Sequence, residues 1–177
     1  MKYISLFSGI EAETVAWQTL GWEPVAYAEI EPFPKAVLKH HYPNVPDLGD
    51  MTKVNWKEYH HAADVVVGGS PCQAFSIAGL RKALDDPRGQ LMLEYLRACA
   101  EIDPEWIVWE NVPGVLSAEH GRAFQSLLEA VAELWPDGGA HGECWTLSSS
   151  VWPSGASVCS LSSTLETGGG PRRDFLS

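Results

Sequence analysis

The sequence predicts an α/β fold built on a doubly wound, mostly parallel β-sheet. Three observations predict it. Short apolar runs alternate with stretches of helical character between residues 3 and 134, glycines or prolines separate them, and acidic or small polar residues follow several of the runs. Strands that alternate with helices favour parallel pairing, and such sheets bind ligands at the carboxyl ends of their strands.

The first strand is expected at Tyr3–Phe7, where an apolar run is broken by Ser8-Gly9. A helix is expected over Glu11–Leu20, and Gly21 supplies a residue that commonly ends helices. The second strand is expected at Pro24–Ala28. The chain therefore starts with a strand, a turn, a helix and a second strand.

Acidic residues close the second strand, in the segment Glu29-Ile-Glu31. Pro32 suits the first turn of a helix, which we expect to reach about His41. Asp47–Val54 is expected to be a loop or a short strand. The later elements are a strand at Asp64–Val67, a helix at Gly89–Glu101, a strand at Glu105–Trp109, a turn at Glu110–Gly114 and a helix at Gly121–Leu134.

The chain changes character after Trp135, because the remainder is dominated by Ser, Gly and Thr without sustained periodicity. We therefore expect one domain over residues 1–135 and an irregular Gly/Ser-rich tail over residues 136–177. A strand over Leu147–Trp152 is the alternative for part of this tail.

Composition sets broad limits on function. The chain has 177 residues, of which 45% are hydrophobic and 20% charged, which suits a single domain with a real core. It holds no apolar run of about 20 residues, so we expect a soluble cytoplasmic protein with no membrane partner. The net charge of −11 opposes nucleic-acid binding, which needs Lys and Arg for phosphate contacts.

Cysteine and histidine spacing predicts neither a disulfide framework nor a metal site. The four cysteines, Cys72, Cys99, Cys144 and Cys159, form no C-x-x-C pair. Cys99 is expected to be a small core residue of a helix. The adjacent pairs His40-His41 and His60-His61 are interpreted as surface histidines, because sequence neighbours point in different directions on a helix or a strand.

The segment Asp64–Ser76 singles out one cysteine. Apolar residues lead into Gly68 and Gly69, which permit a tight turn, and Pro71 stiffens the chain just before Cys72. This arrangement predicts a thiol presented at the carboxyl edge of the sheet. A lone cysteine is more often an ordinary buried thiol, so the segment needs support from elsewhere.

Three weaker signals precede that cysteine. The turn containing Phe7 and Gly9 can bring backbone N–H groups close to a ligand. Glu29 lies about twenty residues further on, where α/β nucleotide binders place a carboxylate on ribose hydroxyls; its alternative is a solvated helix-cap carboxylate. Asp50 can accept from an adenine amino group, although Gly49-Asp50 is also a common turn pair.

The pairing of Ser70-Pro-Cys-Gln73 with Trp109-Glu-Asn-Val112 is more specific. Together with Ala74–Gly79 and Asp86–Leu91, these segments resemble the DNA (cytosine-5) methyltransferase family. The resemblance covers residues 1 to about 135 and includes the early motifs in the family's order. It implies a Rossmann-like S-adenosylmethionine-dependent methyltransferase, incomplete as it stands, from a bacterial or phage restriction-modification setting.

The resemblance implies a mechanism in which Cys72 adds to C6 of cytosine and so activates C5. Its thiolate is the reactive form, and turn amides or Arg88 would lower its pKa. Glu110 would stabilise the charge that develops on the base, and Asn111 would fix the loop that carries Glu110. The methyl group would come from S-adenosylmethionine.

By the same resemblance, Phe7 and Gly9 line the adenosyl and methionine parts of the cofactor, Glu29 holds ribose, Asp50 meets adenine and Leu91 closes the pocket.

The implied substrate is double-stranded DNA with the cytosine flipped out of the helix. Gln73, Ser76 and Arg88 are the expected DNA contacts, in or beside a loop over Ser76–Arg88 that closes on DNA in the family.

The chain departs from the family in two places. Glu11-Ala12 stands where the family usually has two glycines. No Gln-x-Arg-x-Arg motif, target-recognition domain or later Asn segment follows, because the last Gln is Gln125 and the last Asn is Asn111. We therefore expect a truncated catalytic domain, or one member of a split enzyme whose second chain supplies recognition. The sequence also allows a non-catalytic S-adenosylmethionine-binding fragment, such as a decayed phage product, and an RNA cytosine-5 methyltransferase.

Overall fold

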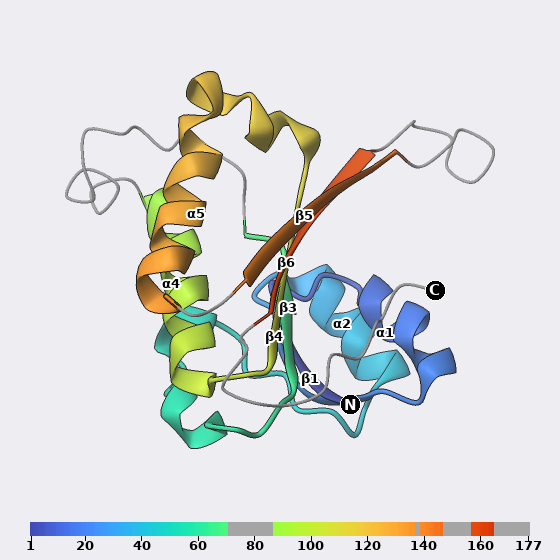
Figure 1. The fold of residues 1–177 in the computed structure, drawn as a ribbon. Coiled ribbons are helices and arrows are strands. Elements are labelled where there is room, and N and C mark those ends of the chain that lie inside the picture. The colour runs from blue at the N-terminus through green and yellow to red at the C-terminus, as the bar shows by residue number, and fades with distance from the viewer. Residues whose placement is uncertain (71–86, 137–138, 147–156, 165–177) are drawn as a thin grey trace.

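A computed structural model describes residues 1–70, 87–136, 139–146 and 157–164 (Figure 1). In these residues, strands join into one sheet with the order β2-β1-β3-β4-β6-β5. The strands are β1 (Lys2–Leu6), β2 (Glu23–Ala28), β3 (Val65–Gly68), β4 (Trp106–Asn111), β5 (Gly139–Thr146) and β6 (Ser157–Thr164). The α-helices are α1 (Ala12–Trp17), α2 (Pro32–His41), α4 (Pro87–Ile102) and α5 (Arg122–Leu134). The 3-10 helices are η1 (Gln18–Leu20), η2 (Met51–Lys53), η3 (Trp56–Tyr59), η4 (Pro113–Leu116) and η5 (Ala118–Gly121).

The sheet has the predicted parallel, doubly wound core. β2, β1, β3 and β4 pair in parallel, with β1 between β2 and β3. From β1 the chain passes to β2 on one side, and from β2 it crosses back to β3 on the other side of β1. The strand order therefore reverses between β1 and β3, which creates a switch point at the carboxyl ends of these two strands. The α/β prediction is confirmed.

Helices cover both faces of this sheet, with α1 and α2 on one side and α4 and α5 on the other (Figure 1). Strand side chains alternate between the two layers. Tyr3 and Val65 belong to the buried cluster that contains Leu38 of α2, whereas Ile4 and Val66 belong to the larger cluster. That larger cluster also holds Tyr95, Leu96 and Cys99 of α4 and Leu127 of α5. Cys99 is fully buried, as predicted.

Most element boundaries match the sequence patterns, and α2 begins at Pro32 and ends at His41 as expected. The predicted first helix is shorter, because α1 ends at Trp17 and continues only as the turn η1 before Gly21. The predicted turn after the β4 segment is also displaced: Glu110 and Asn111 are the last residues of β4. Pairing with β6 explains that extension, since it continues to the end of β4.

The tail differs from the irregular segment expected after Trp135. β6 pairs antiparallel with β4, and β5 pairs antiparallel with β6. The open edge of β4 supplies the hydrogen-bonding partner for β6, and a partner so distant in sequence leaves no local periodicity to detect. The alternative strand at Leu147–Trp152 lies outside the described residues.

The histidine pairs are exposed, as expected, but their rings do not point apart. The ring centroids of His40 and His41 are 4.8 Å apart, and those of His60 and His61 are 3.9 Å apart. For the second pair the cause is the backbone, because His61 has a φ of 55° and lies in neither a helix nor a strand. Among the described residues, no helix is long and apolar enough to cross a membrane.

Candidate active site

Several of the predicted site residues that the structure describes lie at or just after the carboxyl ends of the parallel strands. β1 ends at Leu6, β2 at Ala28, β3 at Gly68 and β4 at Asn111. Parallel pairing places these ends at one edge of the sheet. The edge has two halves, which we call the β1–β2 half and the β3–β4 half.

In the β1–β2 half, the loop after β1 turns its backbone toward Glu29. The N–H of Gly9 donates to Oε2 of Glu29 at 2.7 Å. Phe7 and Gly9 have φ values of 56° and 54°, in the left-handed region that suits glycine. The space where a Cβ of Gly9 would lie is open to 4 Å. The structure therefore joins Gly9 directly to Glu29, and Phe7 lies two residues before Gly9 in the same loop.

The carboxylate of Glu29 is held by backbone donors. Its Oε1 accepts from the N–H groups of Ile30 and Glu31, each at 2.7 Å, in addition to the bond from Gly9. Glu29 is only 8% exposed, so it is not the solvated cap of the alternative interpretation. A carboxylate has about four acceptor positions, so these three bonds leave room for one hydroxyl donor.

Asp47 and Lys35 support the backbone of Glu29, and the sequence analysis missed both. Asp47 Oδ1 accepts from the N–H groups of Glu29 at 3.2 Å and Gly49 at 3.0 Å. Lys35 Nζ donates to the Glu29 carbonyl at 3.0 Å and forms an ion pair with Asp47. No sequence motif marks Lys35 and Asp47, because they come together with Glu29 only when the loop after β2 folds.

Asp50 has local partners. Its Oδ1 accepts from Thr52 N–H at 3.1 Å and from Thr52 Oγ1 at 2.7 Å, and its Oδ2 pairs with Lys53 Nζ at 2.9 Å. Lys53, followed by Thr52, lowers the pKa of Asp50 to about 2. This geometry fits the turn interpretation of Gly49-Asp50.

Glu11 is a buried acid at the end of the loop that contains Phe7 and Gly9, and the sequence analysis noted it only as a departure from the family's glycines. It adopts a φ of 65° directly before α1, a conformation that glycine enters without strain. It is fully buried, and its Oε1 has no hydrogen-bond partner among the described residues. Burial raises the pKa of Glu11 to about 7, and nearby hydroxyls offset only part of that effect.

A buried hydroxyl network meets the other oxygen of Glu11. Thr14 Oγ1 donates to Glu11 Oε2 at 2.5 Å. The hydroxyls of Tyr3 and Tyr27 lie 2.5 and 2.9 Å from Thr14 Oγ1, and both can donate to it. Burial raises the pKa of each tyrosine, which keeps both as donors. The network connects β1, β2 and α1 beneath the loop that holds Glu29.

In the β3–β4 half, Ser70 links the two strand ends. Its hydroxyl accepts from Trp109 Nε1 at 3.0 Å, and its carbonyl accepts from Asn111 Nδ2 at 2.8 Å. Asn111 Oδ1 also accepts from Val112 N–H at 2.9 Å. Ser70 and Asn111 are buried. Asn111 thus bonds the residue that follows it and the backbone of Ser70, which precedes Cys72 by two residues in the sequence.

Glu110 lies against Gly69. A Cβ on Gly69 would come well inside 3.0 Å of Glu110 Oε2, so glycine leaves this carboxyl group room to lie where it does. Glu110 is half-buried, and burial, followed by the nearby charge of Glu13, raises its pKa. Both effects favour the protonated carboxyl group.

The structure says less about the remaining predicted site residues. Cys72, Gln73 and Ser76 lie outside the described residues. Arg88 lies in the first turn of α4, and Leu91 is partly buried further along that helix. Of the segment that leads to Cys72, the structure describes the residues up to Ser70, which bonds Trp109 and Asn111.

Comparison with known proteins identifies the same part of the chain. Residues 1–134 match the family described as C-5 cytosine-specific DNA methylase. A Type II methyltransferase, M.AquIA from Picosynechococcus sp., is 35% identical over 140 residues, covering 75% of this chain and 56% of that protein. A DNA N-6-adenine-methyltransferase of Escherichia phage P1 is 51% identical over 142 residues, covering 73% of this chain but only 19% of the phage protein. The chain spans 19% and 56% of these two relatives.

Solved structures show the same fold. A prophage-encoded E. coli protein assigned as a DNA modification methyltransferase aligns with a TM-score of 0.75 at 20% identity, covering 94% of this chain and 47% of that one. The Dnmt2 methyltransferase of S. pombe aligns with a TM-score of 0.69 at 20% identity, covering 97% and 53%. Because the family matches residues 1–134, which are most of its length, the chain belongs to the C-5 cytosine-specific DNA methylase family.

Proposed function

We propose that this chain transfers a methyl group from S-adenosylmethionine to C5 of cytosine in DNA, through a covalent adduct with Cys72. The observation that carries the proposal is the bonding of Ser70 by Trp109 and Asn111 at the ends of β3 and β4. Cys72 follows two residues later in the sequence, and Glu110 lies beside Gly69. We infer that Cys72 and Glu110 act together as nucleophile and acid beside the ends of β3 and β4.

The β1–β2 half fits the cofactor. Glu29 offers its remaining acceptor position to a ribose hydroxyl, while Gly9 leaves open space above the backbone of the loop. Exposed apolar side chains of Ile10 and Ile30 adjoin these two residues and suit contact with a purine ring. When bound, S-adenosylmethionine supplies a methyl group on a positively charged sulfur.

The chain's own residues make the cytosine reactive. The Cys72 thiolate forms a bond from Sγ to C6, and the electrons of the C5–C6 double bond move toward C5. Glu110, protonated, donates a hydrogen bond at N3 and stabilises the charge that arrives on the ring. After C5 gains the methyl group, it loses its proton to a base. The electrons return to the C5–C6 bond and the Sγ–C6 bond breaks, releasing the Cys72 thiolate.

DNA recognition is proposed in two parts. Gln73, Ser76 and Arg88 contact the flipped cytosine and its flanking phosphates from this chain. Target recognition comes from sequence outside the family-matched residues 1–134 or from a second chain, which accounts for the acidic charge of −11 on this one. The two relatives that are 35% and 51% identical come from a bacterium and a phage, which supports a bacterial cytoplasmic setting.

The phage P1 relative favours a second candidate function, methylation of adenine at N6. An exocyclic amine carries its own lone pair, so that reaction needs no thiol adduct and would leave Cys72 dispensable. The similarity covers 19% of the phage protein, so its named activity belongs to a much longer chain. Binding of S-adenosylmethionine without catalysis, and methylation of cytosine C5 in RNA, are distinguished from the proposal by the same experiment.

The test measures tritiated methyl transfer to duplex DNA and to RNA, with the methylated base identified by mass spectrometry. The proposal predicts 5-methylcytosine from DNA, its loss in Cys72→Ala, and retention in Cys99→Ala, which removes a buried thiol away from the site. Production of N6-methyladenine that survives Cys72→Ala would support the second candidate. Cofactor binding without transfer to any base would support the binding fragment.

A further inference from the structure

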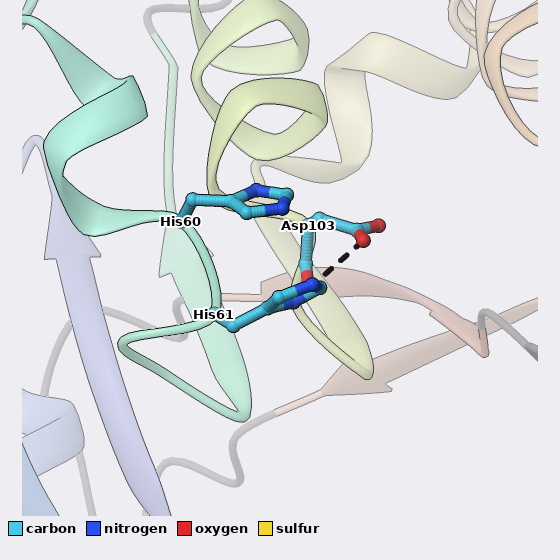
Figure 2. A group of neighbouring side chains, drawn as sticks. All are labelled: His60, His61 and Asp103. Carbon is cyan, nitrogen blue, oxygen red and sulfur yellow. Dashed lines mark hydrogen bonds and ion pairs between the residues drawn. The ribbon is translucent and has the colours of Figure 1, made fainter.

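A second cluster of chemically active side chains lies at the opposite edge of the sheet. His60 and His61 precede β3, and Asp103 lies between α4 and β4. Since β3 and β4 are parallel neighbours, their amino ends meet at one edge, away from the candidate active site. In Figure 2 both imidazole rings extend toward Asp103, and a dashed line joins the Asp103 carboxylate to His61.

We propose that His60, His61 and Asp103 bind a divalent transition-metal ion of the Zn²⁺ class. One potential ligand atom from each residue lies within 4.8 Å of the others. Two imidazoles and a carboxylate are the donor set that zinc accepts, with bonds of about 2.0–2.2 Å. Tetrahedral donors are then about 3.4 Å apart, so the donor atoms, now within 4.8 Å of one another, approach by up to about 1.4 Å through side-chain rotation.

Backbone bonds hold the two loops together without help from a metal. His61 N–H donates to the Ile102 carbonyl at 2.8 Å, and Trp106 N–H donates to the Asp64 carbonyl at 2.9 Å. His61 and Asp103 both adopt left-handed conformations, with φ values of 55° and 54°. These turns direct the three side chains to a common point.

The ring nitrogens are arranged as in a supported metal site. His60 Nδ1 lies 3.1 Å from the Glu101 carbonyl oxygen, and His61 Nδ1 lies 3.2 Å from that of Asp103. When Nδ1 carries the proton, it donates to this carbonyl and leaves the lone pair of Nε2 for a metal. Such bonds to backbone carbonyls orient metal-binding histidines and raise their basicity.

Asp103 contributes a carboxylate beside His61. Asp103 Oδ2 lies 3.7 Å from His61 Nδ1, and the two side chains are 37% and 63% exposed. Three protein donors leave coordination positions for water, which suits an exposed site. Asp103 lies 42 residues after His61, which is why the histidine spacing alone predicted no metal.

The other histidine pair provides a matched control. His40 and His41 are adjacent, exposed and in ring contact, with centroids 4.8 Å apart. Within the described part of the chain, the ligand atoms of His60, His61 and Asp103 lie close enough together to hold a metal ion, and His40 and His41 belong to no such group. Loss of the two control histidines therefore removes imidazoles without removing the proposed site.

The test titrates Zn²⁺ alone into the full chain by calorimetry and follows the Tm with and without Zn²⁺. His61→Asn and Asp103→Asn are the variants, because asparagine tolerates a positive φ. We expect each variant to lose about tenfold or more in Zn²⁺ affinity and to lose most of the Zn²⁺-dependent rise in Tm. The double variant His40→Gln/His41→Gln keeps both.

A variant still folds if its Tm in the presence of a chelator equals that of the wild type. If His61→Asn or Asp103→Asn fails to fold, His60→Gln is measured in its place. Wild-type affinity in His61→Asn and Asp103→Asn would overturn the proposal, as would equal losses in the control variant. Absence of Zn²⁺ binding by the wild-type chain would also overturn it. Zinc held by cysteines would persist in every histidine variant and is thereby distinguished.

Discussion

The two halves of the candidate active site are built differently. In the β1–β2 half, backbone N–H groups converge on the carboxylate of Glu29, above a buried acid, Glu11. In the β3–β4 half, the side chains of Trp109 and Asn111 cross from one strand end to Ser70 on the next. The first half makes a fixed acceptor, whereas the second ties two loops into one unit. Substitutions in the β1–β2 half should therefore lower cofactor affinity, whereas substitutions in the β3–β4 half should lower methyl transfer.

The largest expected effect comes from Gly69→Ala. The new Cβ would come well inside 3.0 Å of Glu110 Oε2 and displace that carboxyl group. We expect methyl transfer to fall by about hundredfold while S-adenosylmethionine affinity stays unchanged, because about 1 Å of misplacement costs that much. Single-turnover transfer and cofactor titration measure the two quantities.

Gly114→Ala is the matched control for Gly69→Ala. Its Cβ would have 4.0 Å to the nearest atom, the Cγ2 of Val112. Equal loss of transfer in the two variants would break the assigned role of the Gly69–Glu110 contact.

Next in size is the pH dependence of Glu11. Its pKa rises from the ordinary 4.5 to about 7 in the folded chain, so the folded chain keeps a proton that the unfolded chain releases. The free energy of unfolding therefore falls from about pH 4.5 to pH 7 and levels above that, by about 3 kcal/mol at most.

Glu11→Gln removes this titration while keeping nearly the same shape. We expect the variant to unfold like the wild type near pH 4.5 and to be more stable than the wild type at pH 8, in urea titrations at each pH. A constant difference between the two proteins across that range would contradict the buried protonated acid.

Asn111→Ala tests the connection within the β3–β4 half. It leaves the Ser70 carbonyl and the Val112 N–H without their partners, at a cost of about 1–3 kcal/mol in the free energy of unfolding. Methyl transfer should fall beyond what this instability explains, with cofactor affinity retained. Asn55→Ala is the control, because exposed Asn55 bonds only locally to Glu58 and should cost under about 0.5 kcal/mol.

The smallest effect is expected in cofactor affinity instead of methyl transfer. Glu29→Gln weakens an acceptor in the β1–β2 half, so S-adenosylmethionine affinity should fall by about tenfold with little change in transfer at saturating cofactor. Asp50→Asn, whose oxygens serve Thr52 and Lys53, should change that affinity by less than about threefold. A larger loss in Asp50→Asn would restore the adenine contact expected from the sequence.

The sequence analysis could predict what depends on local pattern. Apolar runs located β1 to β4, Pro32 marked the start of α2, and glycines marked the turns at the sheet edge. Glu29 and Glu110 were identified as candidate site residues from their positions at or just after the ends of strands. The family resemblance, not periodicity, assigned roles to them and to Cys72.

Interactions between distant segments could not be predicted. The bond between Asn111 and Ser70 spans 41 residues, and the approach of Asp103 to His61 spans 42. β6 pairs with β4 across a still longer separation, so its polar sequence read as irregular. Glu11 looked like a departure from a glycine motif, while its burial depends on Tyr3, Tyr27 and Thr14 folding around it.

The central claim is that Cys72 attacks cytosine from the framework of the β3–β4 half. Its most direct test uses duplex DNA containing 5-fluorocytosine, because a fluorine at C5 cannot leave as a proton does and the adduct persists. The account predicts a denaturant-stable complex of protein and DNA that requires S-adenosylmethionine and is absent in Cys72→Ser. A complex that forms equally well in Cys72→Ser, or N6-methyladenine as the product of that variant, would contradict it.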